Sequence, residues 1–378
     1  MFKNSHISVY INGIPIKYIS ELHYKNDSEH IGASCDIIVP LMALTLYNQT
    51  SKNQLTQANI TNSQTGFSII VKGKYDENAS DSTADEQGFI TIFDGYIYDI
   101  IQGTPSKIMC KDASYLMNIK PLNNDGAVPT TLKKILQNLI IPEANKHLNA
   151  GDVPLSLITP IVDMPLENFT IKEMTGLAIL SHIKHETGIN ISIVGRALYA
   201  NVASNTTNTV NLSTDKDIIE ASLQPINTTF LNLKIKAWFV KKDSTKDSFE
   251  LGQATDSQIR EIYLYFVTPG ADIMINTLEG QKLVPKNYYT LAQNALLKYK
   301  QRRYSGSIKI KLYPVCDVFW RVVYTDVRYP EINGVYVITS QNIDLTEKSG
   351  WVRTLKMAYL ANTVTQANEL TENGTSFI

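Results

Sequence analysis

Two histidines, His182 and His185, are the residues of this chain whose type and spacing come nearest to a metal site. They lie three positions apart in a segment with helical periodicity, and Glu186 follows them directly. This spacing is acceptable for two ligands on one helix face, but a metal needs further ligands, and no second His, Cys or Asp cluster occurs in the sequence. A solvated helix face is the preferred interpretation. We therefore predict no metal site and no cofactor.

Enzymatic chemistry finds little support in the sequence. There is no GxSxG, HExxH, P-loop or GxGxxG motif, so the main motif-borne reactions are not indicated. Two carboxylates can catalyse hydrolysis without leaving a sequence signature, so a cell-wall hydrolase stays a hypothesis that no motif supports. Asp215 and Asp217 could bind Ca²⁺ but lack EF-hand spacing, and a capping role is preferred for them. We predict that the chain is not an enzyme and has no catalytic residue.

Basic residues of the second half of the chain form the remaining candidate site: Lys234, Lys236, Lys298, Lys300, Arg302, Arg303, Lys309 and Lys311. If the strands that carry them are neighbours, these side chains form a basic band that lines a channel for DNA or an extended protein. Tyr299 and Tyr304 lie among them and would suit a subunit interface equally well. Charge runs more often mark only a solvated strand face, so that interpretation comes first.

The overall composition favours a protein partner. The chain has 378 residues, 43% of them hydrophobic, and its 19% of charged residues is below the roughly 25% of an average soluble protein. Its formal net charge of -1 gives no global attraction to nucleic acid or to an anionic membrane. No apolar stretch reaches the length of a membrane-spanning helix, so we expect no membrane insertion.

The three cysteines indicate a reducing compartment. Cys35, Cys110 and Cys316 are odd in number, widely spaced and free of any CxxC motif. This pattern favours free buried thiols over disulfides. The N-terminus enters a strand pattern without an apolar signal region, so we expect synthesis in the cytoplasm.

The patterns along the chain divide it into four parts. Residues 1–118 alternate in hydrophobicity and open with an Asn12-Gly13 hairpin turn, which predicts a first β-barrel domain. Residues 119–205 predict a compact αββ insert. A first helix is indicated by Leu132, Ile135, Leu136 and Leu139 after the candidate N-caps Thr130 and Thr131, and a second helix would start at a capping box of Thr170 and Glu173. Residues 206–360 return to alternation around a helix at 286–301, which predicts a second β-barrel domain, and residues 361–378 form a polar tail. The expected fold class is mainly β, of the α+β type.

An imperfect internal repeat links the two β domains. Gly95–Leu116 and Gly334–Leu360 each show a strand opened by Gly, a polar turn and a second alternating strand. A repeated unit near the end of each domain indicates two similar barrels, which we expect to superpose. Two similar barrels in one chain allow a trimer to imitate a six-fold ring.

The order of these parts resembles the tail hub, or baseplate hub, proteins of tailed phages. This group includes late control protein D and the first part of type VI secretion spike proteins. The resemblance rests on the Gly95–Leu116 unit, the insert around residues 170–200, and the segments YYTLAQNALLKYKQRRYSGSIKIKLYP and YPEINGVYVITSQNIDL. Each motif is weak alone, so the specificity lies in their order and spacing.

The resemblance implies a homotrimer whose two barrels per subunit form a pseudo-hexameric ring. Such a ring joins a tail tube or distal tail protein to a spike or tail fibre protein. Its channel admits the tape-measure protein and lets DNA transit without sequence-specific binding. The location implied is the virion, at the tail tip or baseplate. No spike repeat or lysozyme-like domain follows the hub part, so we expect the piercing element to be a separate protein.

Two other functions stay open. The chain could be the hub of a phage-like contractile injection or type VI secretion machine. It could also be a carbohydrate-binding, receptor-binding tail protein, because Tyr, Asn and Thr are abundant on β scaffolds. A trimer in solution favours the hub, whereas a monomer that binds glycan favours the last alternative.

Overall fold

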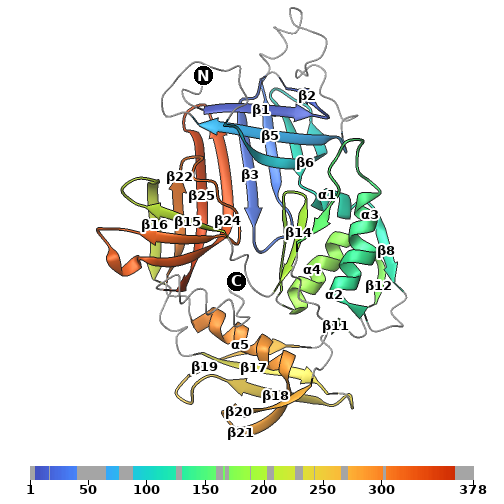
Figure 1. The fold of residues 1–378 in the computed structure, drawn as a ribbon, viewed down its shortest axis with the longest axis vertical. Helices are drawn as coiled ribbons and strands as arrows, with labels where there is room; N and C mark the ends of the chain where they lie inside the picture. The colour runs from blue at the N-terminus through green and yellow to red at the C-terminus, as the bar shows by residue number, and fades with distance from the viewer. Residues whose placement is uncertain are drawn as a thin grey trace, which may run out of the picture.

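The computed structural model describes residues 5–16, 18–40, 65–75, 88–124, 130–158, 165–166, 170–187, 189–201, 208–225, 233–241, 243–264, 271–300 and 304–361. Within these ranges the protein is mainly β, as expected, and most strand pairs are antiparallel (Figure 1). A 13-stranded sheet dominates the fold, and it contains strands from both ends of the chain.

The first β unit contributes seven strands to this sheet. Buried and half-buried or exposed residues alternate along its third and fourth strands, as period-2 hydrophobicity requires. Asn12 and Gly13 turn the chain with φ of 48° and 78°, which confirms the expected hairpin. The strands are β1 (Ser5–Ile11), β2 (Ile14–Pro15), β3 (Glu21–Asp27), β4 (Ser34–Val39), β5 (Ser68–Tyr75), β6 (Ile90–Ile101) and β7 (Ser106–Lys111).

The second β unit contributes six strands that come from two separated stretches of sequence. They are β15 (Thr209–Ser213), β16 (Ile218–Pro225), β22 (Tyr304–Ile310), β23 (Arg321–Thr325), β24 (Gly334–Thr346) and β25 (Gly350–Ala361). A short 3₁₀ helix, η7 (Pro330–Ile332), precedes β24. The expected tail after β25 lies outside the described residues.

A small α/β unit is inserted between β16 and β22. It has a three-stranded sheet, a hairpin and one helix, which packs on β17 (Figure 1). Among the described strands, those of this unit pair only with one another. The elements are β17 (Leu233–Val240), β18 (Lys246–Leu251), β19 (Gln258–Tyr263), β20 (Asp272–Thr277), β21 (Gly280–Pro285) and α5 (Lys286–Lys300).

The insert between the two β units is richer than a simple αββ motif. Its helix α4 and the hairpin β13–β14 match the expected order. The helix expected after Thr131 is also present, as α2, and Thr131 Oγ1 caps it by accepting the Lys134 N–H at 3.3 Å. The elements of the insert are α1 (Ser114–Met117), β8 (Pro121–Asn124), β9 (Thr130–Thr131), α2 (Leu132–Ile135), the π-helix η5 (Leu136–Ile140), α3 (Ile141–Asn145), β10 (Ser156–Leu157), β11 (Pro165–Leu166), β12 (Ile171–Thr175), α4 (Gly176–Thr187), β13 (Asn190–Val194) and β14 (Ala197–Asn201).

The predicted capping box of Thr170 and Glu173 is wrong. The segment is strand β12, which pairs with β8, and the Glu173 N–H donates to Asn123 Oδ1 at 2.7 Å. The helix starts later, where Thr175 Oγ1 accepts a hydrogen bond from the Ala178 N–H at 3.3 Å. Pairing with a strand about fifty residues away therefore overrides the local helix signal.

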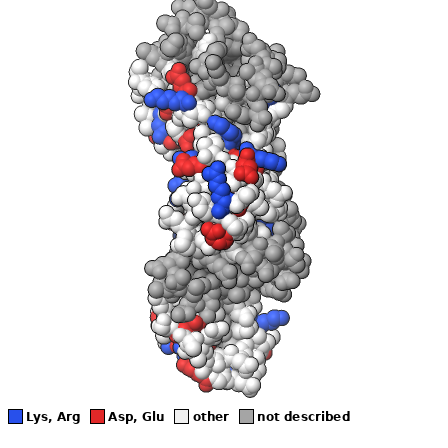
Figure 2. Space-filling model, turned by 90° about the vertical axis from the view of Figure 1, so that its left-hand side faces the viewer, with Lys and Arg blue, Asp and Glu red and all other residues white. Residues whose placement is uncertain are grey.

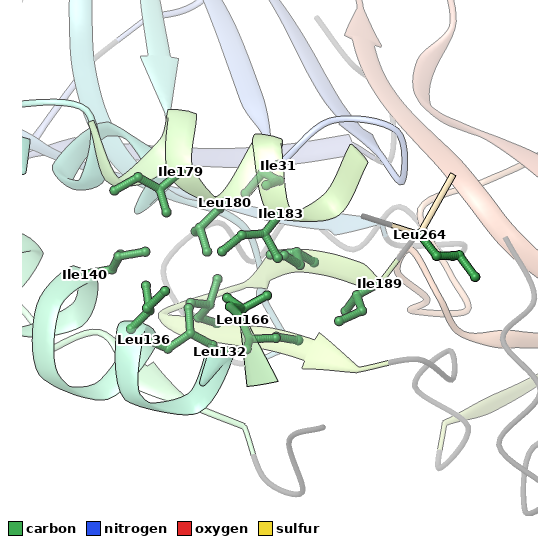
Figure 3. Close-up of a cluster of buried hydrophobic side chains, with 14 of the residues drawn as sticks. Ile31, Leu132, Leu136, Ile140, Leu166, Ile179, Leu180, Ile183, Ile189 and Leu264 are labelled. Atoms are coloured by element: carbon green, nitrogen blue, oxygen red, sulfur yellow. The ribbon is translucent and has the colours of Figure 1, made fainter. Parts of the chain in front are cut away.

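The insert is held together by a buried apolar layer between α4 and the α2–η5 helix. Ile179, Leu180 and Ile183 of α4 face Leu136 and its neighbours across this layer (Figure 3). Ile31, from the turn between β3 and β4, and Leu264, which follows β19, belong to the same buried cluster. The insert core is thus continuous with the first β unit and with the small α/β unit.

Candidate assembly surface

The two β units have the same strand order. Numbered by position in the chain and leaving out the short β2, the first unit runs β3-β4-β7-β6-β5-β1 across the sheet, or 2-3-6-5-4-1. The second unit runs β16-β22-β25-β24-β23-β15, which is again 2-3-6-5-4-1. They differ at one point, because β1 pairs antiparallel with β5 whereas β15 pairs parallel with β23. The sequence repeat thus reflects a repeated topology.

A β-bulge fixes the residue correspondence between the units. In β6 the pairing with β7 shifts between Ile97 and Asp99, and in β24 the pairing with β25 shifts between Ile338 and Ser340. Ile97 also exchanges backbone hydrogen bonds with the segment at the start of β5, and Ile338 does the same with the segment before β23. Because a bulge bends a strand at a defined position, the two bulges indicate that Ile97 and Ile338 hold equivalent positions in their units.

The two glycines that suggested the repeat are not equivalent to each other. If Ile97 is equivalent to Ile338, the residue of β24 that is equivalent to Gly95 is Tyr336, not Gly334. Gly334 does open its strand, but Gly95 lies inside β6, where a Cβ atom would come 2.2 Å from the Lys111 carbonyl oxygen. The expectation that Gly opens both strands is therefore wrong, while the repeated strand pairs do hold equivalent positions in the sheet order.

The two units are joined edge to edge. The second half of β24 pairs antiparallel with β3, in a register that runs from Ser340 opposite Asp27 to Leu345 opposite Leu22. On one face this joint buries apolar side chains such as Ile343 and Tyr24. On the other face His23 Nδ1 lies 2.8 Å from Asp344 Oδ1. The fifth strand of one unit thus meets the second strand of the other.

Polar contacts hold the insert against the first β unit. The Lys184 ammonium donates to the Ser28 carbonyl and, at 3.2 Å, to the Ile191 carbonyl. Burial of this side chain lowers the pKa of Lys184 to about 8. Elsewhere the Tyr96 hydroxyl donates to Asp152 Oδ2 at 2.7 Å. These contacts fix the position of the insert against the first β unit.

Three of the basic residues proposed as a band lie on strands of two different sheets. Lys234 and Lys236 are on β17 of the small α/β unit, whereas Lys309 is on β22 of the large sheet and Lys311 follows it. Among the described strands, β17 and β22 do not pair with each other. Arg302 and Arg303 lie outside the described residues, as do the side chains of Lys298 and Lys300.

Acidic partners accompany two of these lysines. Lys309 Nζ lies 2.6 Å from Glu220 Oε2, and Lys236 Nζ lies 3.6 Å from Glu250 Oε1. In the described part of the face that Figure 2 shows, basic and acidic side chains are intermixed. The lining of a channel by these residues stays a prediction.

The other residues considered for metal binding or reactivity have structural roles, or do not belong to a ligand cluster among the described residues. Asp217 Oδ2 accepts the Ser213 N–H at 3.0 Å, which confirms a capping role in the turn before β16. His182 and His185 lie on α4, and the described residues hold no group of three or more His, Cys, Asp or Glu side chains suited to a metal. The cysteines are free and buried, as predicted, and burial raises the pKa of the Cys35 and Cys110 thiols. Among the described helices, none has the length and hydrophobicity to cross a membrane.

Comparison with known proteins places this fold. No protein family model and no curated protein matches the sequence. The structure, however, matches a tail protein from Neisseria meningitidis with a TM-score of 0.62 at 13% identity, over 94% of this chain and 96% of that one. The chain has the fold of phage tail proteins. The resemblance drawn from the sequence is therefore confirmed at the level of the fold.

Two further structures share the phage tail protein fold over almost their full length. The 43 kDa tail protein of prophage MuSo2 from Shewanella oneidensis matches with a TM-score of 0.59 at 12% identity, over 93% of this chain and 97% of that one. Prophage tail protein gp18 from Listeria monocytogenes matches with a TM-score of 0.51 at 13% identity, over 97% of this chain and 98% of that one. At such low identity the shared property is the fold.

Proposed function

We propose that this chain is the hub of a phage-type tail, and that three copies close into a ring around the tail axis. The observation that carries the proposal is the pair of β units with the same strand order joined edge to edge. Two similar units per chain give a three-subunit ring six similar positions, which suits contact with a six-fold tube on one side. The other side of the ring keeps three-fold symmetry for a spike or fibre.

The partners of such a hub are proteins. The ring would contact a tail tube or distal tail protein and a spike or fibre protein, and its channel would hold the tape-measure protein and then pass DNA. We assign it no catalytic step, so its role is to adapt one symmetry to another. A contractile injection or type VI secretion machine needs the same adaptor, and the fold supports this second setting equally.

Mass measurement in solution tests the proposal first. Native mass spectrometry or light scattering of the purified chain, alone and with its tube protein, should give a trimer or a co-assembly. A monomer that binds glycans and ignores tube protein would overturn the hub and favour a receptor-binding role. Electron microscopy of particles with antibody-labelled protein should then place it on the axis at the tail tip.

A further inference from the structure

One edge of β6 is paired over only part of its length. On the side opposite β7, strand β5 pairs with residues Ile90–Tyr96 of β6, and the contacts end at Ile97. No described strand pairs with residues Tyr98–Ile101 on that side. The equivalent edge of β24 is paired along both parts of the strand, since β23 pairs with the first part of β24 and β3 pairs with the second part. The first β unit therefore lacks, among the described strands, the partner that the second unit has.

Strand β16 is the candidate partner for the unpaired part of β6. It holds the second position in its unit, as β3 does in the other, and among the described strands it pairs only with β22. Most of its residues are exposed, and Ile219 keeps 53% of its surface accessible. On β6, Ile101 is likewise 53% exposed. Open edge strands with exposed apolar residues are templates for pairing with another chain.

We propose that the end of β16, Gln224–Pro225, pairs with the end of β6, Ile100–Ile101, in a second copy of this chain. This inference rests on the proposed ring and specifies its subunit contact. Inside the chain, β24 of the second unit pairs with β3 of the first unit. In a ring of alternating units, the rotation that moves each unit onto the next carries β24 onto β6 and β3 onto β16. It therefore brings β6 of one chain next to β16 of another chain. Such a contact is head-to-tail, and it closes into a ring when the rotations sum to a full turn.

The internal joint also gives the register of the proposed contact. Ile97 corresponds to Ile338, so Ile101 corresponds to Asn342, which lies opposite Lys25. Ile37 of β4 and Ile308 of β22 hold equivalent positions, because they pair with equivalent residues of β7 and β25. Leu22 of β3 pairs with Ile37, and Ala221 of β16 pairs with Ile308, so Leu22 and Ala221 also correspond. Three residues further along each strand, Lys25 corresponds to Gln224. In the contact between subunits, Ile101 is thus placed opposite Gln224.

The chemistry of the two edges fits a short apolar joint. Ile100, which is 4% exposed, points to the same face as the buried residues of the internal joint and would continue that apolar layer towards Leu223. The ion pair of His23 and Asp344 has no counterpart, because the corresponding positions are Gly103 and Ser222. We therefore expect subunit association that depends weakly on salt and that dilution reverses before the subunits unfold.

Disulfide trapping tests the register. Directly opposite residues of antiparallel strands lie about 4.5–5.5 Å apart between Cα atoms, within the range that a disulfide spans. The double variant Ile101→Cys/Gln224→Cys should form covalent trimers under mild oxidation. Mixing the two single variants should give crossed dimers only, which shows that the bond joins different chains. The native cysteines are buried, so their background should be low.

A matched control uses an equally exposed position on another sheet. Ile259 on β19 is 57% exposed, so Ile101→Cys/Ile259→Cys has the same number of accessible thiols without the proposed contact. It should give less than a tenth of the covalent product. A chain that is a trimer by mass but gives no more product than this control would overturn the β6–β16 contact and leave the hub intact. A chain that is monomeric at all concentrations, and joins no tube protein, would overturn both.

Discussion

Arg196 and Asp94 form a two-point ion pair that fixes the insert to the first β unit. Arg196 Nη2 lies 2.6 Å from Asp94 Oδ1, and Arg196 Nε donates to Asp94 Oδ2 at 3.0 Å. The guanidinium also lies over the Tyr96 ring, 4.8 Å from its centroid. Burial on its own lowers the pKa of Arg196, but the hydrogen bonds to Asp94 and Tyr96 outweigh it and raise this pKa. The Arg196 guanidinium therefore keeps its charge in the folded protein.

Removal of Arg196 should therefore destabilise the protein. The side chains of Arg196 and Asp94 are 11% and 24% exposed, so we expect Arg196→Ala to cost about 2 kcal/mol, between the values for exposed and buried pairs. Arg196→Lys should rescue little, because an ammonium cannot make both hydrogen bonds. Urea unfolding of Arg196→Ala, Asp94→Ala and the double variant gives the coupling energy by a double-mutant cycle.

An exposed ion pair serves as the control for that cycle. Lys309 and Glu220 keep 44% and 60% of their side chains accessible, so Lys309→Ala should cost less than about 1 kcal/mol. Equal losses for Arg196→Ala and Lys309→Ala would contradict an anchoring role for Arg196.

Gly95→Ala should destabilise the first β unit. The added Cβ would meet the Lys111 carbonyl oxygen at 2.2 Å and the Phe93 side chain at 2.6 Å, so the pairing of β6 with β7 would have to shift. Overpacking of this kind costs about 1–3 kcal/mol. Gly103→Ala is the matched control, because its nearest neighbour is at 3.4 Å, and thermal unfolding should show no more than a small change. Similar melting temperatures for the two variants would disprove the close-approach argument.

Lys184 should make stability depend on pH in the alkaline range. Its pKa in the folded protein is about 8, below its value in the unfolded chain, so the unfolded chain binds more protons between these two values. The free energy of unfolding should therefore rise with pH from about 8 to about 10.4, by an amount on the order of 2–3 kcal/mol. Lys184→Met should lack this rise, whereas the exposed Lys146→Met should keep it. Parallel pH profiles for the wild type and Lys184→Met would refute the assignment.

Asp247 should support the small α/β unit at neutral pH. Its carboxylate lies 2.7 Å from Lys241 Nζ and 2.5 Å from Lys282 Nζ, which connects β18 with β21. Burial on its own raises the pKa of Asp247, but hydrogen bonds from Lys241 and Lys282 outweigh it and lower this pKa to about 2. The stabilisation is present above about pH 4 and is lost as the pH falls through about 2. Solvent screening limits it, so Asp247→Asn should cost less than about 1 kcal/mol at pH 7.

Circular dichroism melts of wild type and Asp247→Asn should differ at pH 7 and converge near pH 2. A difference that persists unchanged at pH 2 would mean that the variant acts through packing, not through the charge of Asp247.

Local sequence patterns predicted the elements that depend on near neighbours. The Asn12-Gly13 turn, the alternating strand β17 and helix α5 all follow from residue preferences within a few positions. The capping box of Thr170 and Glu173 was read in the same way and is wrong, because β8 offers that segment a strand partner. Local preference decides an element only where no distant partner competes for its backbone.

Periodicity and residue type were enough to predict the mainly β class, the buried free cysteines and the presence of a repeated strand pair, because these properties depend directly on them. The three-dimensional structure was needed to find the common strand order, the joint of β24 with β3, the pair of Arg196 with Asp94 and the separation of β17 from β22. Each of these depends on which distant segments lie side by side. A strand's own residues specify its two faces, but they carry no label for the strand that will pair with its edge.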